Sequence, residues 1–344
     1  MAIIGTYEEV ARPTKVEVVS LGRTRSRLWR IVSASRAVSM AIRQNAHIYH
    51  VHGPENIPVA LVLRLLFRKK VIYDSREDFP SMMLTKEYLP RPLRSVAQKM
   101  TLFAERLAAR FLNGFITADA GTLRNYARTG ASRKLVFYNF PNLEYFAGPG
   151  SAEAKKFDVV YRGGLSERAG TMVLLRAIAY LRQRGVNVSL LMFGYTDSER
   201  SAESIRRVIA DLRIEDLVVL GGIIPHARMA QTLSQARVAV CPLLGIPKFM
   251  NNIPVKVFEA WACGLPVIAT DLPPIRPFFP RSQRSLLVPP GSPEALAAVI
   301  EYVLAHPQLA KEYGRQANRL VRERYNNSCE VRKLLRFYGE LLRA

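Results

Sequence analysis

The sequence is poor in cysteine and has no long apolar run. Its three cysteines, Cys241, Cys263 and Cys329, are odd in number and lack CxxC spacing, which favours free thiols in a reducing compartment over a disulfide framework or a zinc site. The best apolar stretch, residues 57–67, is broken by Arg64 and is shorter than the roughly 18 residues that a membrane span needs. The first residues lack the basic and apolar regions of a secretory signal. We therefore expect a cytoplasmic protein that does not cross a membrane.

Acidic residues are also scarce. The chain has 344 residues, with 28 Asp and Glu against 50 Lys and Arg, which gives a formal net charge of +22. This excess favours an anionic partner, which can be nucleic acid, an anionic membrane or a phosphorylated small molecule. No RNP, KH, helix-turn-helix or zinc-finger pattern is present, so we do not expect nucleic acid as the partner.

Apolar β-branched runs alternate with helical patterns along most of the chain. This alternation predicts the α/β class, with two doubly wound domains on parallel sheets. A stretch rich in proline, glycine and small residues, Pro141–Ala154, indicates a linker, so we place the domains at residues 1–148 and 149–325. A final helix at residues 326–344 is expected to pack back on the first domain. The expected strands are residues 16–21, 48–52, 70–74, 114–117, 157–161, 189–193, 217–220, 238–242, 266–270 and 285–288.

Two segments that directly follow expected strands carry candidate chemistry. The first, Tyr161–Gly170, contains Gly163 and Gly164, which let the backbone approach a ligand, and Arg162 and Arg168 as cations beside a helix start. It is a candidate diphosphate cradle. Its spacing is not that of a dinucleotide fingerprint, and a glycine pair at such a turn is more often turn chemistry.

The second segment, residues 251–270, predicts a helix that starts near Pro254 and is capped by Asn251 or Asn252. Lys256 then lies in the first turn, where it and the free amides would meet an anion. Glu259 lies on roughly the same face and could accept two hydroxyl donors, as a ribose diol offers. The alternative is an ordinary Lys–Glu surface pair, which spacing alone favours.

The second segment resembles the C-terminal signature of retaining family 4 glycosyltransferases. Four further segments, in order and at similar spacing, resemble other motifs of that family, and a fifth resembles the turn before its last sheet-packed helix. These are residues 48–58, 71–77, 137–141, 161–170 and 289–294.

The resemblance implies a GT-B fold, in which two Rossmann-like domains face a cleft. A nucleotide-sugar donor would bind mainly to the second domain and an acceptor to the first, with no cofactor and no metal, because basic groups and helix starts stabilise the leaving diphosphate. The implied catalytic residues are His52 and Asn251. The implied donor-binding residues are Gly163, Gly164, Arg168, Lys256, Glu259, Asn252 and Ile253, and the implied acceptor residues are Arg76 and Glu77.

The sequence also departs from the family pattern. Asn251 stands where the wider family has a glutamate, and Ala169 where it has a basic residue, which leaves Arg168 or Arg162 to reach the phosphates. Arg76 replaces a histidine, and it could meet an anionic acceptor or pair with Asp74 or Glu77. Residues 1–13 supply neither the expected first strand nor a glycine-rich loop, so the first domain is expected to be truncated.

Three histidines, His47, His50 and His52, gather at one expected strand, and we expect them on one side of it. A zinc site is conceivable, but carboxylate or cysteine ligands at familiar spacing are not nearby, so we expect a cleft role for His52 and no metal. Residues 18–54 contain no acidic residue, and residues 91–111 predict an amphipathic helix with basic residues between its apolar positions. That helix is expected either to face the core or to rest on anionic lipid.

The resemblance and the charge together predict a retaining, metal-independent hexosyltransferase peripheral to the inner face of the plasma membrane. It would move a sugar from a nucleoside-diphosphate sugar to a lipid-linked saccharide acceptor in the synthesis of capsule, exopolysaccharide or lipopolysaccharide. The alternative is a non-catalytic glycosyltransferase-like scaffold or partner subunit.

Overall fold

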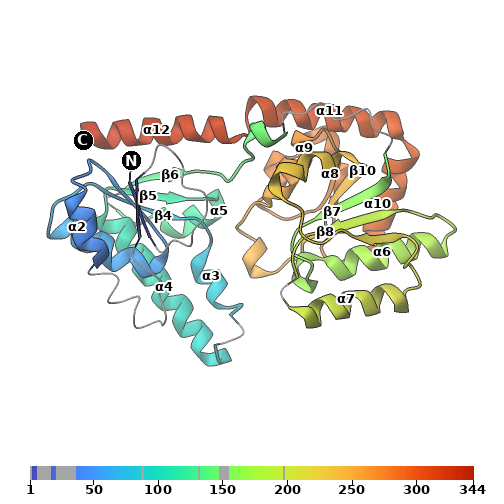
Figure 1. Cartoon of the computed structure of the whole chain (residues 1–344), viewed down its shortest axis with the longest axis horizontal. Coiled ribbons are helices and arrows are strands. Elements are labelled where there is room, and N and C mark those ends of the chain that lie inside the picture. Colours follow the sequence, from blue (N-terminus) through green and yellow to red (C-terminus); the bar gives the residue numbers. More distant parts are fainter. Residues whose placement is uncertain are drawn as a thin grey trace. The chain divides into compact units, whose positions relative to one another are not determined.

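The computed structural model describes residues 2–5, 17–20, 36–86, 89–130, 132–146, 155–196 and 198–344. The chain forms two compact units (Figure 1): the first comprises Met1–Phe137 and Arg332–Ala344, and the second comprises Tyr138–Val331. The sequence pattern placed the start of the second domain at residue 149, whereas the second unit of the structure begins earlier, at Tyr138. The reason is that Phe140 and Phe146 are buried in the second unit's core.

The first unit contains two parallel sheets. A four-stranded sheet has the order β3 (Tyr49–His52), β4 (Val71–Ser75), β5 (Gly114–Thr117), β6 (Arg133–Val136). A separate pair joins β1 (Ala2–Gly5) to β2 (Glu17–Ser20). The expectation of no strand in residues 1–13 is therefore wrong for Ala2–Gly5, since four residues are too few for a recognisable pattern. The glycine-rich loop expected to be missing falls on residues outside the described ones.

Helices flank the sheet of the first unit. They are residues 36–43, α2 (Ile57–Leu65), α3 (Phe79–Met83), α4 (Arg91–Phe111) and α5 (Ala120–Leu123). The last helix, α12 (Asn327–Arg343), returns to this unit, where Phe337 and Leu341 form a buried cluster with Ile72 of β4 and Ile116 of β5. Among the described residues, no helix is both long and apolar enough to span a bilayer.

The second unit is a six-stranded parallel sheet with a Rossmann-type order, β12-β11-β10-β7-β8-β9. Chain order reverses between β7 (Phe157–Arg162) and β10 (Ala236–Cys241), and ligands of such sheets bind beyond the carboxyl ends of the strands at this point. The other strands are β8 (Leu190–Phe193), β9 (Val218–Leu220), β11 (Val267–Thr270) and β12 (Leu287–Val288). The helices of this unit are α6 (Thr171–Gln183), α7 (Glu199–Asp211), α8 (Met229–Ser234), α9 (Val255–Ala262), α10 (Pro293–Ala305) and α11 (Pro307–Glu323).

Candidate active site

The glycine loop after β7 lies directly against α9. Gly163 has a φ of +152°, and a Cβ built on it would stand 2.6 Å from Nζ of Lys256. Gly170, with a φ of +80°, would place a Cβ 1.7 Å from the carbonyl oxygen of Pro242, which follows β10. Both positions have a positive φ, which favours glycine, and at Gly170 the backbone of Pro242 also leaves no room for a side chain. The loop therefore meets α9 and the end of β10 at the switch point of the sheet.

Lys256 lies in the first turn of α9, as the sequence predicted. The helix begins at Val255, and Pro254 occupies the N-cap position without a side-chain cap hydrogen bond, so the prediction that Asn251 or Asn252 caps the helix was wrong. Nζ of Lys256 lies 4.9 Å from the centroid of the Tyr161 ring. The Tyr161 hydroxyl in turn donates to the carbonyl oxygen of Gly164 at 2.8 Å. The lysine cation is thus held beside the glycine loop.

Glu259 is a buried carboxylate one turn further along α9. It is 5% exposed, and its Oε2 lies 2.9 Å from Nη1 of Arg162, the last residue of β7. Burial raises the pKa of Glu259, and the charge of Arg162 offsets part of that rise. A Lys–Glu surface pair is excluded, since the carboxylate is buried and its ion-pair partner is Arg162. Sequence reasoning had treated Arg162 only as an alternative phosphate ligand.

Among the described residues, two predicted site residues have a buried oxygen without a hydrogen-bond partner. They are Asn252, with Oδ1, and Glu77, with Oε2. Oε2 of Glu259 is also buried, and its partner is the Arg162 guanidinium. Buried acceptors are nearly always satisfied in folded proteins, so such exceptions require an explanation. The Asn252 oxygen lies in the second unit just before α9, where a hydroxyl donor of a ligand would satisfy it.

The remaining predicted donor residues lie on the same two segments. Arg168 is exposed in a short 3₁₀ turn, Glu167–Ala169, and its carbonyl oxygen accepts from the Leu244 amide at 3.3 Å. Asn251 and Ile253 are half-buried just before α9. The structure therefore brings Gly163, Gly164, Lys256 and Glu259 into one contiguous group, with the others beside it in the chain.

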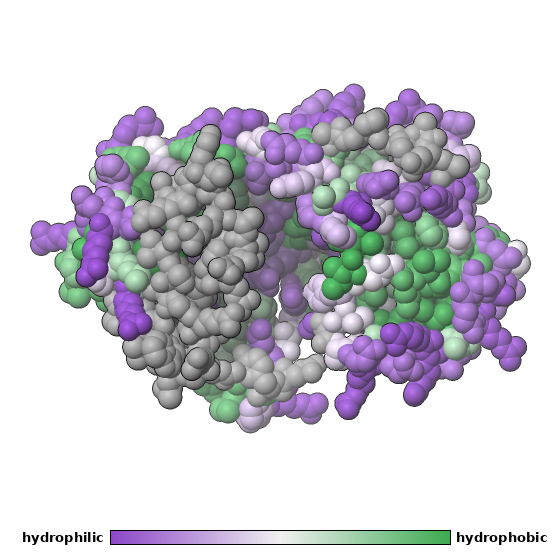
Figure 2. Space-filling view, in the orientation of Figure 1, coloured by the Kyte–Doolittle hydropathy of each residue, from purple (hydrophilic) through white to green (hydrophobic). Residues whose placement is uncertain are grey.

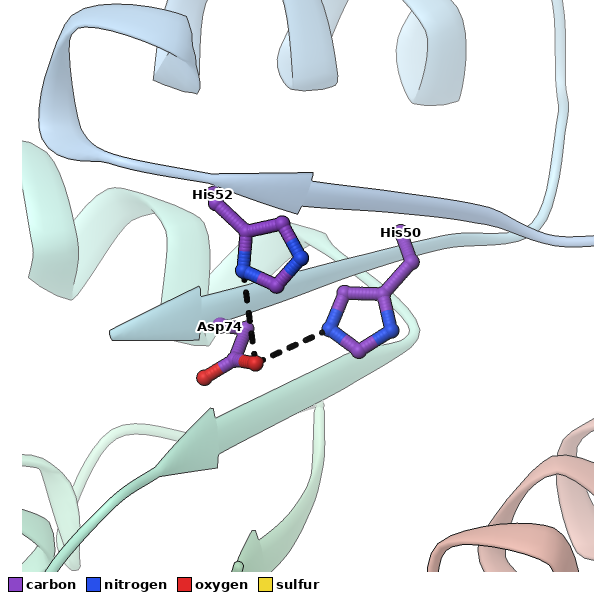
Figure 3. Close-up of side chains that lie close together, drawn as sticks. All are labelled: His50, His52 and Asp74. Atoms are coloured by element: carbon purple, nitrogen blue, oxygen red, sulfur yellow. Dashed lines mark hydrogen bonds and ion pairs between the residues drawn. The ribbon is translucent and has the colours of Figure 1, made fainter. Parts of the chain in front are cut away.

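In the first unit, His52 belongs to a cluster with His50 and Asp74 (Figure 3). His52 and Asp74 are paired residues at the carboxyl ends of β3 and β4. Oδ2 of Asp74 lies 3.2 Å from Nε2 of His50 and 3.3 Å from Nδ1 of His52, and the two imidazoles are stacked at 4.6 Å. His47 precedes β3, so the expected grouping on one side holds only for His50 and His52.

A carboxylate does stand beside these histidines, contrary to the expectation from spacing, because Asp74 comes from the neighbouring strand. The ligand atoms of His50, His52 and Asp74 all lie within 4.8 Å of one another, a grouping that could hold a metal ion. However, Nε of Arg76 lies 3.4 Å from the same Asp74 oxygen, so a cation already stands there. Of the roles weighed for Arg76, the structure shows the pairing with Asp74. Glu77, the other predicted acceptor residue, follows it.

Comparison with known proteins supports the resemblance. Residues 156–306 match the family model described as Glycosyl transferases group 1. The amylovoran biosynthesis glycosyltransferase AmsK of Erwinia amylovora is 32% identical over 137 residues, which are 40% of this chain and 33% of that protein. The phosphatidyl-myo-inositol mannosyltransferase of Mycolicibacterium smegmatis is 26% identical over 294 residues, 85% of this chain and 70% of that protein. The matched part of this chain spans only about a third of the length of AmsK.

Solved structures resemble the whole chain. Sucrose-phosphate synthase from Thermosynechococcus elongatus aligns with a TM-score of 0.77 at 20% identity, covering 96% of this chain and 85% of that one. Anabaena HepE in complex with UDP and glucose aligns with a TM-score of 0.73 at 17% identity, covering 94% and 86%. The resemblance to family 4 glycosyltransferases is thus confirmed: residues 156–306 form a group 1 glycosyltransferase domain, and the chain has the GT-B fold.

Proposed function

We propose that this chain is a retaining glycosyltransferase that moves a hexosyl group from a nucleoside-diphosphate sugar to a lipid-linked saccharide in cell-envelope polysaccharide synthesis. The observation that carries the proposal is the group around α9, where Arg162 holds the buried carboxylate of Glu259 and Lys256 lies beside the glycine loop. A carboxylate for a diol and a cation for a diphosphate at one sheet edge suit a nucleotide sugar.

The charges of this group support a reaction without metal. Lys256, the loop amides and the start of α9 offer positive charge where a diphosphate would leave, which stabilises the developing charge of the transition state. Arg168 is exposed on the same loop and adds a second cation. Asn252 and Asn251 offer amides to sugar hydroxyls. In the first unit, His52, Arg76 and Glu77 would face the acceptor or the transferred sugar.

The names of the relatives and neighbours support the substrate classes. HepE was solved with UDP-glucose as well as with UDP and glucose, AmsK is named for amylovoran biosynthesis, and the enzyme of Mycolicibacterium smegmatis is named a phosphatidyl-myo-inositol mannosyltransferase. We therefore assign a sugar nucleotide as the donor and a lipid-linked acceptor on the cytoplasmic side of the plasma membrane.

The helix α4 supports contact with an anionic membrane. Its apolar positions Leu93, Val96, Met100 and Phe103 are 51%, 51%, 67% and 64% exposed, at a spacing that puts them on one stripe. Of the two alternatives for this helix, facing the core or resting on anionic lipid, the exposure of these four residues favours the second. The buried positions of α4 are Glu105, Ala108 and Ala109 instead, because small residues let the helix approach the sheet.

Basic residues surround this apolar stripe. Arg91, Lys99, Arg106 and Arg110 are exposed on the same helix. Near the start of α4, hydrophobic and hydrophilic surface lie side by side in the view of Figure 2. An exposed apolar stripe with flanking cations is typical of helices that lie at the surface of anionic membranes.

A panel assay tests the function. The purified full chain would be incubated with UDP-, GDP- and dTDP-sugars, with and without EDTA, and with membrane extracts as the acceptor source. We expect one donor class to bind, a labelled sugar to enter the lipid fraction, and EDTA to leave the rate unchanged. Donor binding without transfer would indicate the alternative, a non-catalytic relative, and absence of both would overturn the proposal.

A further inference from the structure

A continuous line of polar contacts runs from the last helix of the chain to His52. Tyr338 of α12 has its hydroxyl 2.5 Å from Nδ1 of His50, whose Nε2 lies 3.2 Å from Oδ2 of Asp74. The same oxygen lies 3.3 Å from Nδ1 of His52. Asp74 is 3% exposed, whereas the His52 side chain is 47% exposed, so the line leads from the interior to the surface of the first unit.

The positions of the protons follow from the donor and acceptor capacity of each group. A carboxylate oxygen accepts, so the hydrogen bond between His50 and Asp74 places a proton on Nε2 of His50. The 3.3 Å contact of Nδ1 of His52 with the same oxygen favours a proton on that nitrogen. Nδ1 of His50 can then accept, and the Tyr338 hydroxyl donates to it. Burial raises the pKa of Tyr338, which is consistent with a hydroxyl that keeps its proton.

We propose that Asp74 and His50 are positioning residues for His52, and that they hold its proton on Nδ1 so that Nε2 presents a lone pair to a hydroxyl of bound sugar. This inference rests on the proposed function for the identity of that ligand. Nδ1 is engaged with Asp74 in Figure 3, and the two nitrogens of an imidazole point in different directions, so Nε2 remains for a ligand. Desolvation lowers the pKa of His52 to about 4, which agrees with a neutral ring that accepts at Nε2.

The alternative use of the cluster is metal binding, and two contacts oppose it. Arg76 brings a positive charge to the Asp74 oxygen that a metal would need, at 3.4 Å. The proton that His50 directs at Asp74 would also have to leave. The cluster therefore suits proton placement better than a divalent cation, and titration with Zn²⁺ separates the two.

The first experiment determines the tautomer of His52 and needs no measurement of enzymatic activity. Two-bond ¹H–¹⁵N spectra of the ¹⁵N-labelled full chain, assigned with His50→Gln and His52→Gln, would show which nitrogen of His52 is protonated. We expect protonated Nδ1 in the wild type and a shift toward protonated Nε2 in Asp74→Asn, because the asparagine amide can donate where the carboxylate cannot. Asp216 is exposed and pairs with Arg182, so Asp216→Asn is the matched control and should leave the tautomer of His52 unchanged.

The second experiment compares rates in the variants whose amide spectra show an intact fold. We expect Asp74→Asn to lower kcat by about 10- to 100-fold with little change in donor KM, as a misplaced catalytic group does. Tyr338→Phe removes one hydroxyl without changing the shape of the side chain, and it should lower kcat by less than Asp74→Asn does.

The outcomes separate the two claims. A wild type with the Nδ1 proton and no transfer activity would overturn the proposed function and leave the tautomer assignment standing. An active enzyme with the His52 proton on Nε2, or with both tautomer and kcat unchanged in Asp74→Asn, would overturn the inference. Micromolar Zn²⁺ that shifts the signals of both histidines in the wild type but not in Asp74→Asn would overturn it as well, in favour of a metal site.

Discussion

Arg162 and Glu259 form an ion pair that joins β7 to α9, with Nη1 and Oε2 2.9 Å apart. The charge of Arg162 favours the ionised form of a carboxylate whose burial raises its pKa. The pair also fixes the carboxylate beside the glycine loop, so a ligand hydroxyl meets an acceptor that is already oriented. In the proposed donor site, the same pairing makes the two residues interdependent.

The first prediction concerns Glu259. We expect Glu259→Gln to weaken nucleotide-sugar binding by about 10- to 100-fold, because hydrogen bonds to a charged acceptor contribute about 1.5–3 kcal/mol. Isothermal titration with the donor identified in the panel measures this. Glu312→Gln, an exposed glutamate that pairs with Arg315, is the control and should bind as the wild type does. Equal affinities in all three proteins would contradict a role of Glu259 in the donor site.

The second prediction concerns Lys256. Lys256→Met keeps the side-chain length and removes the cation, so we expect it to weaken UDP binding by about 30-fold while uridine binding stays the same, since about 2 kcal/mol is typical of a lost charged contact. Competition titrations with uridine, UMP and UDP would separate the phosphate contribution from that of the base. If the panel identifies another base, its own nucleosides replace these. Loss of affinity for all three ligands alike would point to a distorted site instead.

The third prediction concerns α4. We expect Met100→Glu with Phe103→Glu to reduce binding to vesicles of anionic lipid, because two exposed apolar contacts are replaced by charges that the lipid repels. Flotation with phosphatidylglycerol vesicles, compared with neutral phosphatidylcholine vesicles, checks this. The matched variant Val219→Glu with Leu220→Glu changes two exposed apolar residues of β9 and should float as the wild type does. Equal flotation of both double variants would contradict a role of α4.

The fourth prediction concerns the pH dependence of stability through Glu105. This fully buried carboxylate accepts from Tyr73 at 2.9 Å, from Ser75 at 2.7 Å and from Tyr126. Burial raises its pKa, and the three hydroxyls offset only part of the rise. Above the unfolded-state pKa of about 4.3, the folded state therefore binds more protons at this carboxyl than the unfolded state does. The free energy of unfolding falls as pH rises from there through the raised pKa of the folded state.

Glu105→Gln removes that cost because a glutamine does not ionise. We expect the difference in unfolding free energy between Glu105→Gln and the wild type to shift in favour of the variant as pH rises above about 4. Urea unfolding at several pH values measures it. Glu105→Ala should instead lose about 3 kcal/mol near pH 4, because it leaves a cavity and three unpartnered hydroxyls, and this loss should shrink as pH rises, since alanine does not ionise either. A pH-independent difference for Glu105→Gln would mean that the carboxyl has an ordinary pKa.

Much of the second unit was predictable because its signals are local. The strand expected at residues 157–161 is β7 (Phe157–Arg162), and the helix expected to start near Pro254 is α9, which begins at Val255. Buried parallel strands are continuous apolar runs, and the turns that follow them need glycine, so both are visible in a short window of sequence. The glycine loop, Lys256 and Glu259 could be placed on that basis.

Pairings between distant segments were not predictable, because they depend on which strands lie side by side. Asp74 stands beside His52 since β3 and β4 pair in register, although 22 positions separate the two residues. Tyr338 reaches His50 only because α12 returns to the first unit. The outward face of α4 was equally hidden, since a helical repeat of apolar residues looks the same toward a core or toward solvent.

The sequence by itself determined the alternation of strands and helices, the family resemblance and the strong positive charge, because these are properties of residue order and composition. The tertiary structure alone decided that Glu259 pairs with Arg162, that His52 shares Asp74 with His50, and that the apolar stripe of α4 is exposed. The physical reason is that hydrogen bonds, ion pairs and burial depend on distances between side chains, and residues far apart in sequence acquire those distances only when the sheets form.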